Sequence, residues 1–100
     1  MTIEFRASAT RDLKRSAAFF DEQEAGLGDE FLSEMQQALA ELSFCGGIHR
    51  KRHGFHCMLV SRFHHLVYYF VEGSTVIMCA ILDGRRNPET LVRTLKTRRS

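Results

Sequence analysis

The chain has 100 residues, of which 44% are hydrophobic and 26% are charged. These proportions are typical of one folded domain and exclude a disordered or fibrous chain. The longest apolar run, VIMCAIL at 76 to 82, is too short to cross a bilayer, and the first ten residues lack the apolar segment of a secretory signal. We therefore expect a single domain over residues 1 to 100, located in the cytoplasm and without membrane contact.

The net charge of +2 conceals an uneven distribution along the chain. Residues 1 to 44 contain four basic and nine acidic residues, a charge of −5, whereas residues 45 to 100 contain ten basic and three acidic residues, a charge of +7. A positive field of this kind attracts phosphates or an acidic protein surface. A solvated surface that keeps a small protein in solution is the alternative, and charge alone does not decide between the two.

The first elements expected in chain order are a strand and two helices. Residues 2 to 6 alternate between apolar and polar side chains, the period of a half-buried strand. A helix follows from an N-cap at Ser8 or Thr10 to Gly26, a residue suited to a left-handed C-terminal turn. A second apolar stripe at helical spacing runs from Asp29 to Leu42. Because only two or three residues separate these helices, they are predicted to form an antiparallel hairpin.

Strands and a short helix are expected in the second half of the chain. Apolar runs at 57 to 61, 66 to 71 and 75 to 82 predict three strands, the last two joined in a hairpin by EGS. These last two are apolar on both faces, which predicts a central place in the sheet with the helical hairpin over one side. Asn87 and Pro88 predict the start of a terminal helix. The expected fold is α+β: an N-terminal strand, an antiparallel α-hairpin, a mostly antiparallel sheet of three further strands, and a short C-terminal helix.

Three stretches carry a resemblance to a known family: IEFRASA at the start, ATRDLKRSAAFFDEQEAGLGDEFLSEMQQALAEL in the helical hairpin, and RFHHLVYYFVEGSTVIMCAILDGRRNPE across the last strands. Together they resemble the ParE/RelE superfamily of bacterial toxins from type II toxin–antitoxin modules, often described as plasmid stabilisation proteins. The resemblance implies the fold expected above, growth arrest of the host cell, and a cognate antitoxin that inhibits the toxin in a hetero-oligomer. The sequence has His64 and His65 where the family commonly has Pro-Tyr, and Asp83 where it commonly has His.

The resemblance leaves two activities open. ParE-like members poison DNA gyrase without a hydrolytic site, whereas RelE-like members cleave messenger RNA on the ribosome. Cleavage requires a general base, a general acid and cations around the phosphate. RelE-like nucleases usually carry a Tyr or His near the C-terminus, but here no His follows His65 and no Tyr follows Tyr69. We therefore predict a gyrase-inhibiting toxin. A ribosome-dependent endoribonuclease and an inactive relative that only binds antitoxin are the alternatives.

Two sets of residues are predicted to bind partners. The target is expected to contact a cationic set, listed here in chain order: Arg50, Lys51, Arg52, Arg62, Arg85 and Arg86. Charges on such a surface steer encounter with an acidic partner and fix its register. Phe19 and Leu27 are expected to be partly exposed at the groove between the helical hairpin and the sheet, where an antitoxin helix or strand would cover them.

The remaining candidate residues receive structural interpretations, and no catalytic residue is predicted. The five histidines, His49, His53, His56, His64 and His65, are expected in exposed turns, edges and loops, since no carboxylate neighbours them to orient a ring. The HGFHC segment lacks a second ligand pair at a zinc-like spacing, so neither a metal nor a cofactor is expected. We predict free thiols at Cys45, Cys57 and Cys79. Tyr68 and Phe70 are predicted to share one sheet face, with Tyr69 on the other.

Overall fold

The computed structural model describes residues 1–99. The elements are β1 (Thr2–Phe5), α1 (Ala7–Gln23), α2 (Leu27–Cys45), β2 (Lys51–Arg52), β3 (Phe55–Val60), the 3₁₀ turn η1 (Ser61–Phe63), β4 (His65–Glu72), β5 (Thr75–Asp83) and α3 (Pro88–Thr97). The predicted α+β class and the order of its elements are confirmed, with β2 as an additional strand. Ser100, the last residue of the predicted domain, lies outside the described residues.

The five strands form one sheet in the order β1-β5-β4-β3-β2. β1 runs parallel to β5, and all other neighbours are antiparallel. The predicted central place of the last two strands is confirmed. Between Tyr68 and Tyr69 the register shifts, because they pair with Ala80 and Met78 and leave Cys79 without a partner residue on β4. This β-bulge at Cys79 places one extra residue in β5.

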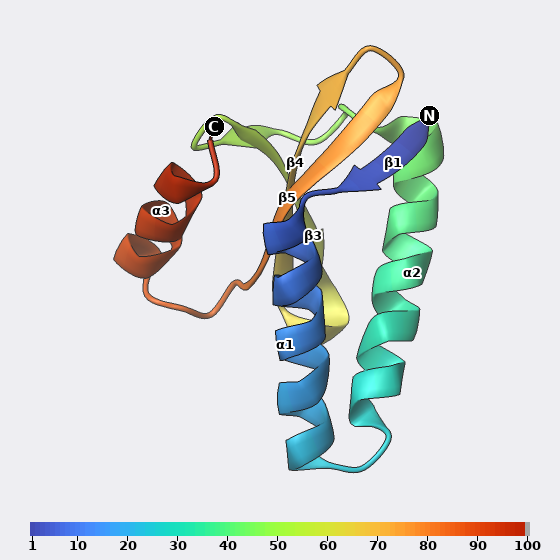
Figure 1. Ribbon diagram of the computed structural model, residues 1–100, viewed down its shortest axis with the longest axis vertical. Coiled ribbons are helices and arrows are strands. Elements are labelled where there is room, and N and C mark those ends of the chain that lie inside the picture. Colours follow the sequence, from blue (N-terminus) through green and yellow to red (C-terminus); the bar gives the residue numbers. More distant parts are fainter. Residues whose placement is uncertain (100) are drawn as a thin grey trace.

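Helices cover both faces of the sheet (Figure 1). The α1–α2 hairpin lies on one face, where Phe31, Met35 and Leu42 join strand residues such as Tyr69 and Met78 in the larger core. This confirms the predicted cover. α3 lies on the opposite face and contributes Leu91 and Leu95 to a second core that contains Tyr68. None of the helices within residues 1–99 has the length and apolar character needed to cross a membrane.

The start of the first helix differs from the prediction. α1 begins at Ala7 with Arg6 at the N-cap position, so neither Ser8 nor Thr10 caps it. Ser8 Oγ instead donates a hydrogen bond of 3.2 Å to the carbonyl of Cys79, the bulge residue of β5. Gly26 has the left-handed conformation expected of it, with φ of 89°, but it is the residue directly before α2.

Candidate functional site

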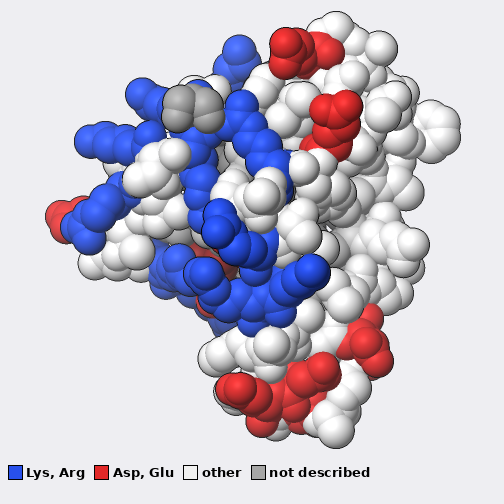
Figure 2. Space-filling model, viewed as in Figure 1, with Lys and Arg blue, Asp and Glu red and all other residues white. Residues whose placement is uncertain are grey.

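Lys and Arg side chains gather over α3 and the neighbouring part of α1, while acidic side chains are prominent at the far end of the α1–α2 hairpin (Figure 2). We define the cationic surface as the exposed residues Arg11, Lys14, Arg15, Arg52, Arg85, Arg86, Arg93, Lys96 and Arg99. Among the described residues, only Arg85 of this set has a carboxylate within 4.0 Å, that of Asp83. The surface therefore presents largely uncompensated positive charge to a partner.

One part of this surface, on α1, is absent from the sequence prediction. Arg11, Lys14 and Arg15 are spaced by three and four residues, so they share one helix face. Arg15 and Arg86 line the same pocket, which joins α1 to the loop after β5. The net negative charge of residues 1 to 44 gives no sign of these three basic residues, whereas their helical spacing in the sequence predicts a shared face.

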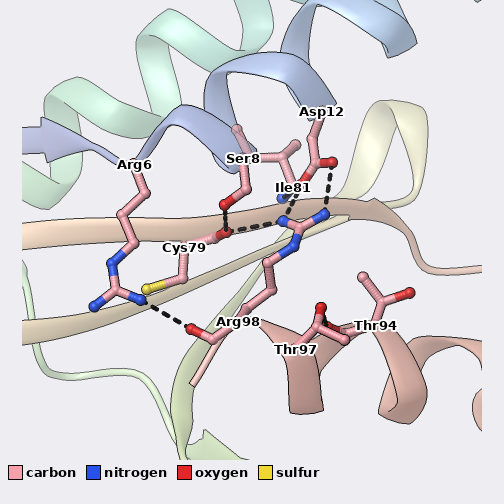
Figure 3. Close-up of polar contacts among 8 residues, drawn as sticks. All are labelled: Arg6, Ser8, Asp12, Cys79, Ile81, Thr94, Thr97 and Arg98. Carbon is pink, nitrogen blue, oxygen red and sulfur yellow. Dashed lines mark hydrogen bonds and ion pairs between the residues drawn. The ribbon is translucent and has the colours of Figure 1, made fainter. Parts of the chain in front are cut away.

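A buried ion pair fixes α3 to the rest of the fold (Figure 3). The Arg98 guanidinium donates to both carboxylate oxygens of Asp12, at 2.7 and 3.1 Å, and to the carbonyl of Cys79 at 3.0 Å. Asp12 also accepts the backbone N–H of Ile81 at 3.0 Å. Arg6 donates to the Arg98 carbonyl at 2.9 Å. The pair thus sets the position of the α3 cations relative to those of α1.

The six predicted target-binding cations do not lie on one face. Arg85 and Arg86 lie in the loop between β5 and α3, and Arg52 pairs with Phe55, whose side chain belongs to the core beneath α3. Lys51 pairs with His56, so it faces the helical hairpin instead, as cross-strand partners share a face. Arg62 forms ion pairs of 3.3 and 3.2 Å with Glu30 and Glu34 of α2. Arg50 is exposed just before β2.

Aromatic side chains border the cationic surface on the α3 face of the sheet. Phe55, Phe70 and Arg99 line a pocket of about 350 Å³, and the Arg6 guanidinium lies 5.1 Å from the Phe70 ring centroid. Tyr68 lies in the same core as Phe55, whereas Tyr69 lies beneath the helical hairpin, which confirms the predicted division of these aromatic residues. Burial and the neighbouring Cys57 raise the pKa of Tyr68 to about 12.

The predicted exposure of the histidines is wrong for His65. Its side chain is 2% exposed, because strand alternation turns it towards the helical hairpin, whereas His64 stays exposed in the preceding turn. The His65 ring contacts those of Phe20 and Phe31, with centroid distances of 5.7 and 4.9 Å. Its Nδ1–H donates to the carbonyl of Phe63 at 2.7 Å, so Nε2 accepts from the Ser16 hydroxyl at 3.2 Å.

Two further histidines form a cluster with Tyr69 beneath the helical hairpin. His56 stacks on Tyr69, and His49 Nδ1 lies 2.6 Å from the Tyr69 hydroxyl. Burial and the proximity of His56 lower the pKa of His49. His49 also lines a groove with Glu34, Glu41 and Arg62. Arg62 forms an ion pair with Glu34, so Glu41 is the carboxylate of this groove that opposes the approach of a phosphodiester. Of the five histidines, only His53 and His64 are exposed, so the expectation of exposed rings holds for these two alone.

The two predicted antitoxin contacts differ in their exposure. Phe19 is 52% exposed on α1, where it packs edge-on against Phe20. Leu27, the first residue of α2, is half-buried against the larger core. Partial exposure of both is as expected, and their contact with an antitoxin stays a prediction. Phe44 and Ile48, near the end of α2, are more exposed, at 91% and 74%, and were not among the predicted contacts.

The three thiols are buried or half-buried in the described part of the chain. Burial raises the pKa of both Cys57 and Cys79, which keeps them protonated near neutrality. Within residues 1–99, no three His, Cys, Asp or Glu side chains converge on a point that would hold a metal ion. The chemistry that the described surface does offer is binding of anions beside apolar and aromatic groups.

Comparison with known proteins does not assign the chain to a family. No sequence model of a protein family matches it. No curated protein matches it either. The ParE/RelE assignment therefore stays a prediction from the residues quoted above.

Proposed function

We propose that the protein is the toxin of a type II toxin–antitoxin module, which inhibits DNA gyrase by protein–protein binding and is held inactive by a cognate antitoxin. The ParE/RelE resemblance implies an α+β fold with this order of elements, and such agreement supports the proposal at the level of fold only. The observation that carries it is the cationic surface, where the exposed Lys and Arg side chains other than Arg85 lack carboxylate partners among residues 1–99.

The cationic surface favours binding over cleavage. Such a field attracts an acidic protein surface and raises the rate of encounter with it. An endoribonuclease would need an acid and a base beside these cations. His65 is buried, and His49 lies in a groove with Glu34 and Glu41. His65 lines a pocket with Arg15 and Arg86, but both of its ring nitrogens already bind Phe63 and Ser16. This ring therefore has no free nitrogen for acid–base work, and RNA cleavage is the weaker proposal.

Inhibition by an antitoxin follows from the same surface. An acidic antitoxin segment would cover the cationic surface and exclude gyrase by competition. Phe19 supplies an exposed apolar contact at the edge of the cationic surface. Arg15, one helical turn before it on α1, belongs to that surface. Toxin, antitoxin and gyrase would meet in the cytoplasm.

The test is expression of the protein from an inducible promoter in cells that lack an antitoxin, together with a gyrase supercoiling assay on the purified protein. The wild type is expected to induce the SOS response and to inhibit supercoiling. Arg85→Gln with Arg86→Gln should remove both effects. Lys51→Gln with Arg62→Gln removes the same charge from two predicted target contacts that lie outside the cationic surface, and it should preserve both effects.

Other outcomes would support the alternatives. Early cleavage of ribosome-bound messenger RNA, lost in a His49→Gln and His56→Gln variant, would indicate an endoribonuclease. Antitoxin binding without growth arrest would indicate an inactive relative. Circular dichroism of each variant establishes that the fold is retained.

A further inference from the structure

A pocket of about 280 Å³ opens beside the cationic surface, between α1 and the adjoining ends of β4 and β5. Its lining consists of Arg15, Ser16, Phe19, Phe20, His65, Asp83 and Arg86. The arginines of its rim belong to the cationic surface, whereas its interior has no part in the proposed gyrase contact. Its volume, just below the range of about 300–1,000 Å³ for ligand pockets, suits one amino-acid residue better than a long segment.

The walls combine three chemical characters within this small volume. Phe19 and Phe20 provide an apolar wall, with their ring centroids 5.5 Å apart. Arg15 and Arg86 provide positive charge, and neither has a carboxylate partner within the described chain. Asp83 provides an acceptor: its Oδ1 takes the backbone N–H and the Nε–H of Arg85, at 2.9 and 3.3 Å. Its Oδ2 accepts from no group among residues 1–99.

At the inner end of the pocket, His65 and Ser16 are hydrogen-bonded to each other. The His65 ring contacts the rings of Phe20 and Phe31, and its Nδ1–H donates to the carbonyl of Phe63. The Ser16 hydroxyl donates its proton to His65 Nε2, so towards a ligand it offers only lone pairs. Ser16 Oγ and Asp83 Oδ2 can therefore each accept a hydrogen bond from an N–H group of a ligand.

A matching ligand must place an anion, an apolar group and an N–H donor within one residue. The C-terminal residue of a polypeptide does so, because it carries an α-carboxylate, a side chain and its own amide N–H. Guanidinium groups bind carboxylates through two parallel hydrogen bonds, and capture of a C-terminal carboxylate is a known mode of peptide recognition. An Asp or Glu side chain has no apolar group beyond its carboxylate, and inorganic phosphate has neither an apolar group nor an N–H.

We propose that this pocket binds the C-terminal residue of a partner polypeptide whose last side chain is apolar. The α-carboxylate lies between Arg15 and Arg86, the side chain packs against Phe19, and the last peptide N–H donates to Asp83 or Ser16. This site does not depend on gyrase being the target or on the existence of an antitoxin, since it rests on the pocket alone.

The experiment is an NMR titration of the ¹⁵N-labelled protein with two N-acetylated Gly-Ser-Gly-Leu peptides, one ending in a free carboxylate and one in an amide. The acid should shift the amide signals of residues 15 to 20 and 83 to 86 saturably. The C-terminal amide should bind roughly 10-fold more weakly or worse, because charge-assisted hydrogen bonds are lost. A Gly-Ser-Gly-Gly acid should also bind more weakly, since it lacks the apolar side chain.

Matched variants locate the site. Arg86→Gln should weaken the acid peptide roughly 10-fold and leave the amide peptide unchanged. Lys51→Gln removes the same charge on β2 and should alter neither affinity. Both positions are exposed, so a dispersed spectrum is expected of each variant.

Four results would overturn the proposal. They are equal affinity for the acid and amide peptides, shifts centred outside the pocket, no saturable shift at millimolar peptide, and displacement of the acid peptide by an equal concentration of inorganic phosphate. The last would define a general anion site. None of these readouts involves toxicity or gyrase, so failure here is distinguishable from failure of the proposed function.

Discussion

Arg98→Gln tests whether the buried ion pair holds α3 in place. The side chains of Arg98 and Asp12 are 16% and 4% exposed, so the substitution leaves a buried carboxylate without its cation. Loss of one partner from such a pair costs about 3–5 kcal/mol. Asp12 keeps the N–H of Ile81, and the Cys79 carbonyl keeps the Ser8 hydroxyl, which places the expected loss near the lower limit, at roughly 3 kcal/mol.

A loss of that size is large for a domain of this length. Small domains are stable by about 5–15 kcal/mol, and each 1 kcal/mol shifts the Tm of a 60–100-residue domain by roughly 4–8 °C. Three times that shift gives an expected fall in Tm of roughly 12–24 °C. The measurement is urea unfolding followed by circular dichroism, with thermal unfolding as a second determination.

Arg62→Gln is the matched control, because it removes an arginine that is 51% exposed and paired on α2. Exposed pairs contribute at most about 1 kcal/mol. A double-mutant cycle with Asp12→Asn isolates the coupling within the buried pair. If Arg98→Gln unfolds at the same urea concentration as Arg62→Gln with an unchanged slope, the buried pair contributes no net stability and the reasoning is refuted.

Three further predictions concern titration and packing. Because burial lowers the pKa of His65, the unfolded chain binds the proton first, and stability should fall as pH drops below about 6.5, by up to about 1.4 kcal/mol per pH unit. Urea unfolding of His65→Gln should lack this component, and an unchanged pH slope would contradict it. A Gly-to-Ala change ordinarily stabilises a helix, but Gly28→Ala should destabilise the fold by roughly 1–3 kcal/mol, because the added methyl would meet the α1 backbone and Asp21. A higher Tm would show that the helical hairpin can accommodate the methyl group. Burial raises the pKa of both Tyr68 and Tyr69, so ultraviolet titration should show less ionisation at pH 10 in the native protein than in the urea-unfolded chain; equal ionisation would contradict this.

The elements that the sequence predicts well are those buried on a large apolar surface. β4 and β5 are apolar on both faces, and the helical stripe of α2 repeats at the period that the core requires. β2 escapes prediction because it has only two residues, Lys51 and Arg52, and neither is apolar. Ser8 has the properties of an N-cap, but the bulge at Cys79 offers its hydroxyl a carbonyl that no local pattern reveals.

The candidate site was predicted less completely, because distant segments build it. Exposure of Arg85 and Arg86 follows from their place after a buried strand. The burial of His65 depends on where β4 begins, since a shift of one residue would have turned its ring to the other face. Arg98 sits in a basic tail that suggests a solvated end, yet it pairs with a carboxylate 86 residues away. Such pairing is a property of the tertiary structure.

Charge repulsion and the buried pair act on α3 in opposite directions. The cations of α1 and α3 repel each other, and Arg98 adds little to this field because Asp12 neutralises it. Leu91, Leu95 and the ion pair hold α3 on the sheet against that repulsion. An anionic partner on the cationic surface would relieve the repulsion and so favour the docked helix. By thermodynamic linkage, docking of α3 would raise the affinity for the anionic partner by the same factor. The buried Arg98–Asp12 pair would therefore affect binding at a surface that it does not contact.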